Sequence, residues 1–398
     1  MTAAAITSTL LGYEPILDRT RKAIAMRFTA RGRAGEPADL AKLQSEFATL
    51  WPADATPVLL RADGDSLPES LLEQPMFKHL WIEVPGALTG SPQGLALIAQ
   101  LHRQGCPMVL GGRPVGTLAP SLLPAFRMSI IDTADDRRLR EPLAPQDQAV
   151  TRRIPYAQAG VKTIAMLRRS FETGALACIG WPFDDATAHA MSSNASPDFG
   201  IITELLTMIG DEADPGDIER VIRRDAALSY RMLRYINSAA FALPVEIQSF
   251  RHAVMMLGYE RLKRWLLLLL MTASKDANMQ PVMFASFRRG LFMEHLVGED
   301  GGSSDRDEVF ILGVLSLIDK LFREPMPVLL DKLHVRDSIR EALLDRSGPF
   351  TAYLGVAEAV EGAPDQQLAD RLDEALVSIE QCNRALVKAV TVREFAAA

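Results

Sequence analysis

The side chains that hold metal ions or act as nucleophiles are scarce in this chain of 398 residues. It has six histidines, three cysteines and four asparagines. Cys106, Cys178 and Cys382 are too widely spaced for a CxxC zinc cluster and too few for a disulfide framework. We therefore expect no metal, no cofactor and no catalytic cysteine, and we expect the chain in a reducing cytoplasm.

Two other segments have compositions that could bind ions. Residues 111–116 (GGRPVG) follow an apolar run, as a phosphate loop would, but they match neither GxGxxG nor GxxxxGK[ST], and Pro114 interrupts them. The acidic residues 299–308 do not follow the order of acidic positions and central glycine of an EF-hand. We expect a structural loop in the first case and a solvated loop in the second.

A cluster of arginines forms the main basic feature of the sequence. Acidic residues such as Glu219 and Asp225 interrupt it, and the formal net charge of the chain is −7 (43 basic minus 50 acidic residues). Solvated helix faces are the first interpretation, an acidic protein partner the second, and nucleic acid the last. If the cluster is a partner surface, its residues are Arg220, Arg223, Arg224, Arg231 and Arg234.

The first half of the chain alternates short apolar runs with helix-like segments. This alternation predicts a parallel sheet with crossover helices, either a barrel or an open sheet, over residues 10–185. The expected strands are residues 57–60, 80–84, 107–110, 128–131 and 177–180, and the expected helices include 92–104 and 157–172.

The remainder of the chain predicts one helix after another. Residues 186–196, rich in Ala and Ser, fit a linker, and 197–398 fit an all-helical domain in which Asp217 is an expected N-cap. The longest apolar run, residues 265–271, is far shorter than the roughly 20 residues that a membrane-spanning helix needs. We therefore expect no membrane span.

Four ordered segments of the second half resemble the HDOD domain, a helical relative of the HD phosphohydrolases. They are residues 197–202, 217–228, 237–241 (NSAAF) and 249–258. HD hydrolases hold metal ions with a His-Asp pair on a helix. The apparent counterpart here is residues 313–320, where Ser316 and Leu317 occupy the two places. The resemblance therefore implies a helical domain without hydrolase activity.

The first half resembles a shortened and degenerate EAL domain, a TIM-like β/α barrel that hydrolyses cyclic di-GMP in its active members. The matching segments, in order, are residues 13–18, 80–84, 127–132 and 170–183. The combination is similar to the bacterial EAL–HDOD architecture over nearly the whole chain.

The EAL resemblance also shows which metal-site residues are replaced. The family's eponymous Glu is matched by Arg27, its paired aspartates by Gly111 and Gly112, its Lys by Ile130 and a late Glu by Lys162. The first 193 residues contain no asparagine, so the family's metal-binding Asn has no counterpart there. Glu83 and Asp132 remain, and two separated carboxylates do not make a two-metal site.

Together, the two resemblances imply a pseudoenzyme that acts in signal transduction by docking to other proteins, such as kinases, cyclases or motility regulators. One alternative is an effector that binds cyclic di-GMP without cleaving it, although the lost pocket residues and the shortened barrel weigh against this. A divergent metal-dependent phosphohydrolase is the other alternative.

Overall fold

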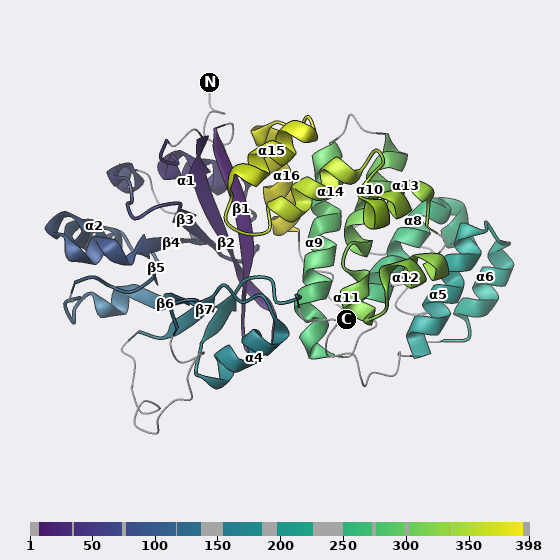
Figure 1. Ribbon diagram of the computed structural model, residues 1–398, viewed down its shortest axis with the longest axis horizontal. Helices are drawn as coiled ribbons and strands as arrows, with labels where there is room; N and C mark the ends of the chain where they lie inside the picture. Colours follow the sequence, from purple (N-terminus) through teal and green to yellow (C-terminus); the bar gives the residue numbers. More distant parts are fainter. Residues whose placement is uncertain are drawn as a thin grey trace. The chain divides into compact units, whose positions relative to one another are not determined.

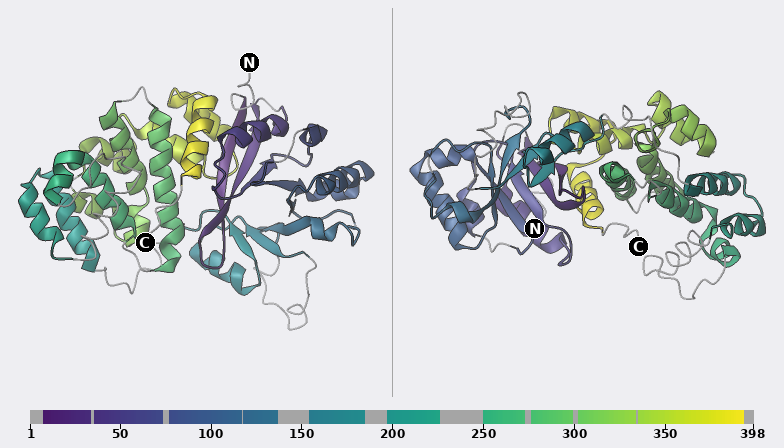
Figure 2. Two further views of the ribbon diagram at one scale, coloured as in Figure 1. Left: turned by 180° about the vertical axis from the view of Figure 1, so that it is seen from behind. Right: turned by 90° about the horizontal axis from the view of Figure 1, so that it is seen from below.

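A computed structural model describes most of the chain, and it separates the chain into two compact units (Figures 1 and 2). The barrel unit comprises residues 1–185 and 355–393, and the helical unit comprises residues 186–354 with 394–398. The described residues are 8–33, 36–73, 77–116, 118–136, 154–184, 197–225, 250–272, 276–298, 302–333 and 335–392.

Eight strands close into a barrel, which confirms the barrel and excludes the open sheet. Strands β2 to β8 run parallel to their neighbours, whereas β1 is antiparallel to both β2 and β8. The expectation of a purely parallel sheet is therefore wrong at β1. Only five residues join β1 to β2, and so short a turn permits an antiparallel pair but no crossover. The strands are β1 (Thr9–Leu17), β2 (Ala23–Gly32), β3 (Val58–Ala62), β4 (Leu80–Pro85), β5 (Met108–Gly111), β6 (Phe126–Asp132), β7 (Tyr156–Ala159) and β8 (Ala177–Ile179).

The helices of the first half begin at good N-caps. Asp39, Ser91 and Thr163 each accept a backbone hydrogen bond in the first turn of α1 (Leu40–Leu50), α2 (Pro92–Arg103) and α4 (Ile164–Glu172). The expected helix over 157–172 is thus half wrong, because its first residues form β7. Alanine favours helix, but Ala157 and Ala159 are buried in the barrel interior, where small side chains are needed.

The barrel interior has an apolar floor. It is lined by side chains from all eight strands, and it includes Ile16, Leu59, Trp81 and Val109. Because side chains alternate between the two faces of a strand, residues two positions closer to the carboxyl ends of β2 to β5 also point inward. Arg27, Arg61, Glu83 and Gly111 therefore form the next interior layer, together with Glu14 from the antiparallel β1.

The C-terminal helices belong to the barrel unit, which differs from the expectation that 197–398 forms one domain. They are α15 (Gln366–Glu374) and α16 (Ile379–Thr391), and α14 (Thr351–Ala359) precedes them. Figure 1 shows α15 and α16 in yellow next to the purple β1. Asn383 of α16 is buried, and its Nδ2 donates to the backbone oxygen of Thr9 at 2.7 Å.

The helical unit contains the expected succession of helices, with three local differences. The N-cap of α6 is Asp214 rather than Asp217, because Pro215 occupies the first helical position and Asp214 Oδ1 accepts from the Gly216 N–H. The apolar residues 309–322 predict one continuous helix, but in the structure the helix ends at Leu315 and a second one begins at Ile318. Part of the acidic stretch expected as a loop is helical, since α10 begins at Ser303. The described helices are α5 (Pro197–Gly210), α6 (Pro215–Ile222), α8 (Phe250–Thr272), α9 (Gln280–Val297), α10 (Ser303–Leu315), α11 (Ile318–Phe322), α12 (Met326–Leu333) and α13 (Asp337–Arg340).

Close packing in the helical unit depends on glycines. Gly258 has φ 74°, a backbone conformation that glycine adopts readily, and it kinks α8. A Cβ at Gly313 of α10 would lie 2.7 Å from the backbone nitrogen of Gly290 in α9, so the two glycines allow these helices to touch backbone to backbone. None of the helices described in the structure is both long and apolar enough to cross a bilayer.

The packing of α16 on β1 predicts a specific loss of stability. Replacing Asn383 by Ala leaves the buried Thr9 oxygen without this donor, which we expect to lower the free energy of unfolding by about 1–3 kcal/mol. Lys388→Ala changes an exposed residue of the same helix and serves as the control. Urea unfolding followed by circular dichroism measures both variants, and equal midpoints would contradict the assignment of α16 to the barrel unit.

Candidate functional site

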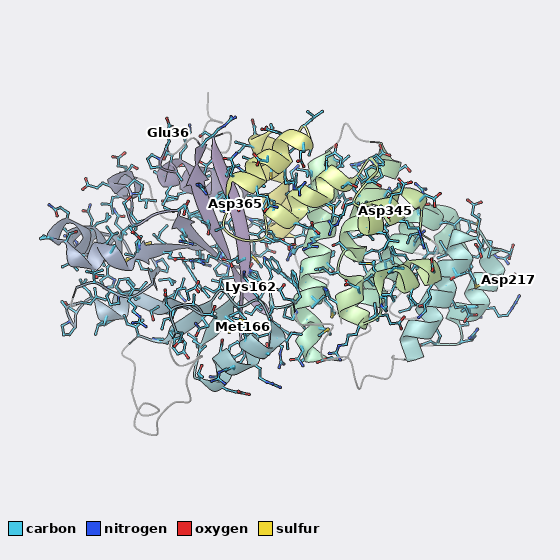
Figure 3. The ribbon with its side chains drawn as sticks, viewed as in Figure 1. Glu36, Lys162, Met166, Asp217, Asp345 and Asp365 are labelled. Carbon is cyan, nitrogen blue, oxygen red and sulfur yellow. The ribbon has the colours of Figure 1, made fainter. Side chains whose placement is uncertain are left out.

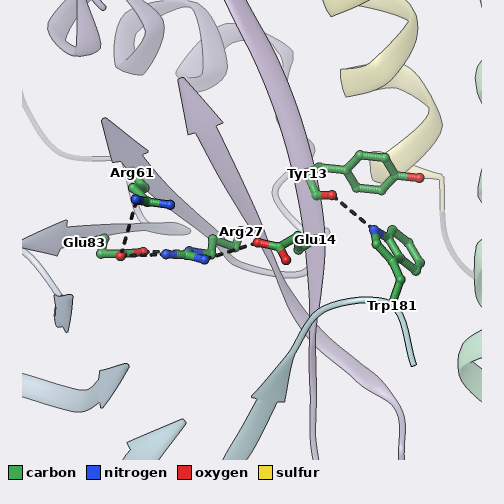
Figure 4. A network of polar contacts seen from close by, with 6 residues as sticks. All are labelled: Tyr13, Glu14, Arg27, Arg61, Glu83 and Trp181. Atoms are coloured by element: carbon green, nitrogen blue, oxygen red, sulfur yellow. Dashed lines mark hydrogen bonds and ion pairs between the residues drawn. The ribbon is translucent and has the colours of Figure 1, made fainter. Parts of the chain in front are cut away.

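A buried ion network occupies the barrel where the metal site of an EAL-type barrel is expected (Figure 4). Arg27 Nη2 lies 2.7 Å from Glu83 Oε1, and Arg27 Nε donates to Glu83 Oε2 at 2.8 Å. Arg27 Nη1 donates to Glu14 Oε2 at 3.2 Å, and Arg61 Nε lies 3.8 Å from Glu83 Oε1. Two arginines and two glutamates thus form a network with no net formal charge.

The strand register explains why these four side chains meet. Glu14 is the β-partner of Arg27, and β3 separates β2 from β4, so that Arg27 and Glu83 face one another within the barrel interior. The side chains of Arg27 and Glu83 are 8% and 6% exposed. A bidentate pair with this little solvent is geometrically specific, and removal of one partner leaves an uncompensated buried charge.

The charge of Arg27 is fixed by its surroundings. Burial by itself lowers the pKa of the guanidinium, but the adjacent Glu83 and Glu14 carboxylates outweigh burial and raise it above the ordinary value. Arg27 is therefore a permanent cation throughout the pH range in which the protein is folded.

The residues at this site do not fit a metal pair. The guanidinium of Arg27 takes both carboxylate oxygens of Glu83, which a metal ion would need as ligands. Gly111 and Gly112 offer no side-chain ligand, and a Cβ at Gly111 would lie 2.8 Å from Glu83 Oε1. Among the residues described, no three His, Cys, Asp or Glu side chains are grouped so that they could hold a metal ion.

The other predicted site residues lie on the strands and loops around this network. Ile130 is buried in the interior cluster on β6, opposite Gly111 of β5, and its backbone oxygen accepts from the Gly112 N–H. Asp132 is exposed, and its Oδ1 accepts from the Ala134 N–H at 2.8 Å. Lys162 is exposed in the loop before α4, where Figure 3 labels it above Met166.

The glycine-rich residues 111–116 are held by protein groups. The buried Thr89 hydroxyl accepts from the N–H groups of Val115 and Gly116, at 2.9 and 3.0 Å, and donates to Gly86 O. Backbone N–H groups that would cradle a phosphate are thus already used. This geometry is that of the structural loop predicted from the sequence.

In the helical unit, Arg289 contacts Ser316, one of the two residues that the HD resemblance matches to a metal-binding His-Asp pair. Ser316 closes α10, and its hydroxyl accepts from Arg289 Nη1 at 3.1 Å and donates to Gly313 O at 2.7 Å. Leu317 is 5% exposed, as a packing residue would be. Nearby, Arg264 binds Glu294 and Asp307 and stacks 3.6 Å from the centroid of the Phe310 ring. Burial lowers the pKa of Arg264, and these two carboxylates raise it by more.

Three arginines of the basic cluster are described, and each is paired with a carboxylate. Arg220 lies 2.7 Å from Asp217, Arg223 bonds to Glu219, and Arg224 lies 2.9 Å from Glu204. Arg231, Arg234 and the 237–241 motif lie outside the described residues. The pairs are solvent-exposed and locally balance the charge of the arginines, as expected of solvated helix faces.

The three cysteines have no nucleophilic character. Cys106, Cys178 and Cys382 are all buried, and burial raises the pKa of each thiol to about 12. Thiolate, the reactive form, is therefore scarce at neutral pH.

Sequence reasoning identified Arg27 and Glu83 separately but missed their pairing. It also missed Arg61. The signal that could have found both is the alternation of side chains along aligned strands, since each of these residues lies two positions after an interior apolar residue. Using that signal requires the strand register, which sequence patterns alone do not give.

The fold defines the class of protein: a closed eight-stranded barrel followed by a helical region. Residues 199–326 match the family model described as the HDOD domain, which confirms the resemblance seen in the sequence.

Two curated relatives share 27% identity with the chain. One is the cyclic di-GMP phosphodiesterase CdgJ of Vibrio cholerae, matched over 195 residues that cover 49% of this chain and 45% of CdgJ. The other is the uncharacterized protein YuxH of Bacillus subtilis, with 40% of this chain and 39% of YuxH covered. The chain thus spans less than half the length of these relatives in the matches.

Solved structures similar to the chain include EAL domains and proteins. A standalone EAL protein of Vibrio cholerae O395 in its c-di-GMP-bound form has 14% identity, 44% coverage of this chain, 91% coverage of that chain and a TM-score of 0.32. The FimX EAL domain of Pseudomonas aeruginosa bound to c-di-GMP has 12% identity, coverages of 44% and 90%, and a TM-score of 0.31.

The ion network predicts asymmetric effects of mutation. Arg27→Met leaves buried Glu83 without its bidentate partner, and we expect the free energy of unfolding to fall by about 3–5 kcal/mol. The double variant Arg27→Met, Glu83→Leu removes both charges and should recover much of this loss. Arg220→Met, in an exposed pair, is the control, with an expected change of under about 1 kcal/mol.

Urea unfolding of the native protein, the single variants and the double variant measures these free energies of unfolding in a double-mutant cycle. If Arg27→Met and Arg220→Met destabilised the protein equally, the buried network would contribute no more than a surface pair.

Proposed function

We propose that this chain is a non-catalytic regulatory protein of cyclic di-GMP signalling, which acts by docking to other signalling proteins. The observation that carries the proposal is the bidentate Arg27–Glu83 pair in the barrel interior. The signalling context is supported by the name of the relative CdgJ, a cyclic di-GMP phosphodiesterase.

The chemistry of phosphodiester hydrolysis at a two-metal site explains why this pair matters. Two divalent cations have to bind a carboxylate cluster, generate hydroxide and stabilise the charge of the phosphate in the transition state. Here a guanidinium already neutralises Glu83, and it can neither generate hydroxide nor be displaced without leaving a buried cation unpaired. This replacement, together with Gly111 and Gly112, supports the proposal that hydrolysis is lost.

The helical unit supports a docking role for a similar reason. Ser316 and Leu317 stand where the HD hydrolases have their His-Asp pair, and Arg289 binds the Ser316 hydroxyl. What this unit retains is a packed helical framework. We propose that its partners are kinases, cyclases or motility regulators, and that the chain acts in the cytoplasm.

The test of lost hydrolysis uses the purified full chain with cyclic di-GMP and excess Mg²⁺ or Mn²⁺. We expect no linear dinucleotide by chromatography, whereas CdgJ assayed in parallel should produce it. Glu83→Gln is the matched variant for contaminating activity. Product from the native chain that disappears in Glu83→Gln would overturn the proposal, and equal traces in both would come from elsewhere.

Calorimetric titration of the same preparation addresses the alternative of a non-hydrolytic effector. We expect no heat of binding with cyclic di-GMP, because the interior charges of the barrel are already paired. Micromolar or tighter binding would contradict the docking proposal for the barrel and would favour the alternative, that the barrel senses the nucleotide.

Cross-linking mass spectrometry of the full chain in lysate of its own host tests docking directly. We expect cross-links from the helical unit to the same signalling protein in independent preparations. If reproducible cross-links arise from neither unit, the docking role is wrong.

A further inference from the structure

The N-terminal part of β1 is paired on one side with residues 360–361, from the C-terminal part of the chain. Strand β8 pairs with β1 only at Ile16 and Leu17, and Gly180 N–H then donates to Pro15 O. Beyond that point, among the residues that the structure describes, no further strand pairs with β1 on this side. The Tyr13 N–H donates instead to Val360 O at 2.8 Å, and Tyr13 forms a parallel bridge with Glu361.

Residues 360–364, which we call the strap, then pass over the inward side of the barrel. Gly12 lies on the same face of β1 as Glu14 and Ile16, and a Cβ at Gly12 would overlap the backbone oxygen of Gly362. On the neighbouring strand, Arg31 Nη1 donates to Pro364 O at 3.3 Å. Arg31 is on the same face of β2 as Arg27, so both contacts are on the interior side.

The strap therefore lies directly above the ion network. Gly12 is paired with Thr29, one layer beyond the Glu14–Arg27 pair, and Leu10 is paired with Arg31 one layer further. This is the end of the barrel where the parallel strands have their carboxyl ends, which is where ligands enter barrels of this kind. Figure 4 shows the polar side chains of the layer beneath.

Both ends of the strap are buried, and its middle is exposed to solvent. Val360 is 1% exposed and Pro364 is buried, while Ala363 between them is exposed. Downstream, the Asn383–Thr9 hydrogen bond anchors α16 to the barrel. Upstream, α14 leads into the strap without a break, and the division between the two units falls inside this helix, after Leu354.

We infer that the strap is an intramolecular cap on the mouth of the barrel, able to open and linked through α14 to the helical unit. An unpaired strand edge can bind an added β-strand through its free backbone groups. In this chain the edge of β1 is instead paired, through one backbone bridge, with the strap. Whatever occupies the mouth competes with the strap. Because α14 continues directly into the strap, we expect changes in the packing of residues 351–354 that alter α14 to shift the same equilibrium. The inference holds whether or not the barrel hydrolyses a nucleotide.

Hydrogen–deuterium exchange of the full chain, read by mass spectrometry, tests this cap. In the native protein, peptides containing Tyr13 and residues 360–364 should exchange faster than those of β2 and β3. Gly12→Ala should speed exchange in both segments about tenfold, the factor that loss of one ordinary hydrogen bond allows. Gly200→Ala, at an open position in α5, is the matched control and should change neither segment.

A second pair of variants keeps the test decisive if Gly12→Ala fails to fold. Arg31→Ala removes both the bond to Pro364 and the ion pair of Arg31 with Asp63, whereas Asp63→Ala removes only the ion pair. Faster strap exchange in Arg31→Ala than in Asp63→Ala supports the cap. Equal exchange in folded variants, or native exchange as slow as in β2 and β3, overturns it.

A separate variant tests whether the strap is coupled to residues 351–354. Leu354 is fully buried at the end of the helical unit, and Leu354→Ala should loosen α14 and speed exchange in the strap. If that variant loosens residues 351–354 while strap exchange stays at the native rate, the coupling is absent.

Discussion

The buried pair between Arg27 and Glu83 is the constraint on which the barrel interior depends. A guanidinium and a carboxylate with almost no solvent must remain together, because either one alone would be a buried charge with a large desolvation cost. The registers of β2 on β3 and of β3 on β4 bring the two side chains together, and the missing side chain of Gly111 makes room for Glu83. Glycine at position 111 therefore avoids a steric clash with Glu83, and it also leaves this position without a side chain that could bind a metal.

The same network would let a barrel keep its framework without divalent cations, as the proposed loss of hydrolysis requires. In a two-metal site, divalent cations balance the charge of the converging carboxylates. In this chain Arg27 supplies the balancing charge covalently, with Glu14 and Arg61 completing a neutral set. The helical unit also has an arginine beside such a position, since Arg289 donates a hydrogen bond to Ser316. In both units, therefore, an arginine contacts a residue at or beside the positions that the resemblances match to metal ligands.

Much of the fold could be predicted because its signals are local. Short apolar runs marked five of the eight strands, and the remainder of the chain predicted a succession of helices. Tyr156–Ala159 was missed because alanine-rich tetrapeptides carry no strand signal, and only the narrow interior selects them. The antiparallel direction of β1 follows from the length of its turn to β2, an indication that the sequence contained but the alternation argument did not use.

The candidate site divides in the same way. Residue types alone showed that Arg27, Gly111, Gly112, Ser316 and Leu317 cannot act as metal ligands, since ligand chemistry is a property of each side chain. The sequence could not show that Arg27 takes both oxygens of Glu83, because that pairing joins strands 56 residues apart. Nor could it assign residues 355–393 to the barrel. That assignment depends on buried contacts such as Asn383 with Thr9, 374 residues apart, and contacts at such separation arise only once the chain has folded. The sequence by itself thus determined the alternation of strands and helices in the first half and the helical class of the second, because these signals are local. Tertiary packing decided that the sheet closes into a barrel, that Arg27 pairs with Glu83 inside it, and that residues 360–364 contact β1 and β2, because each of these depends on contacts between segments far apart in the sequence.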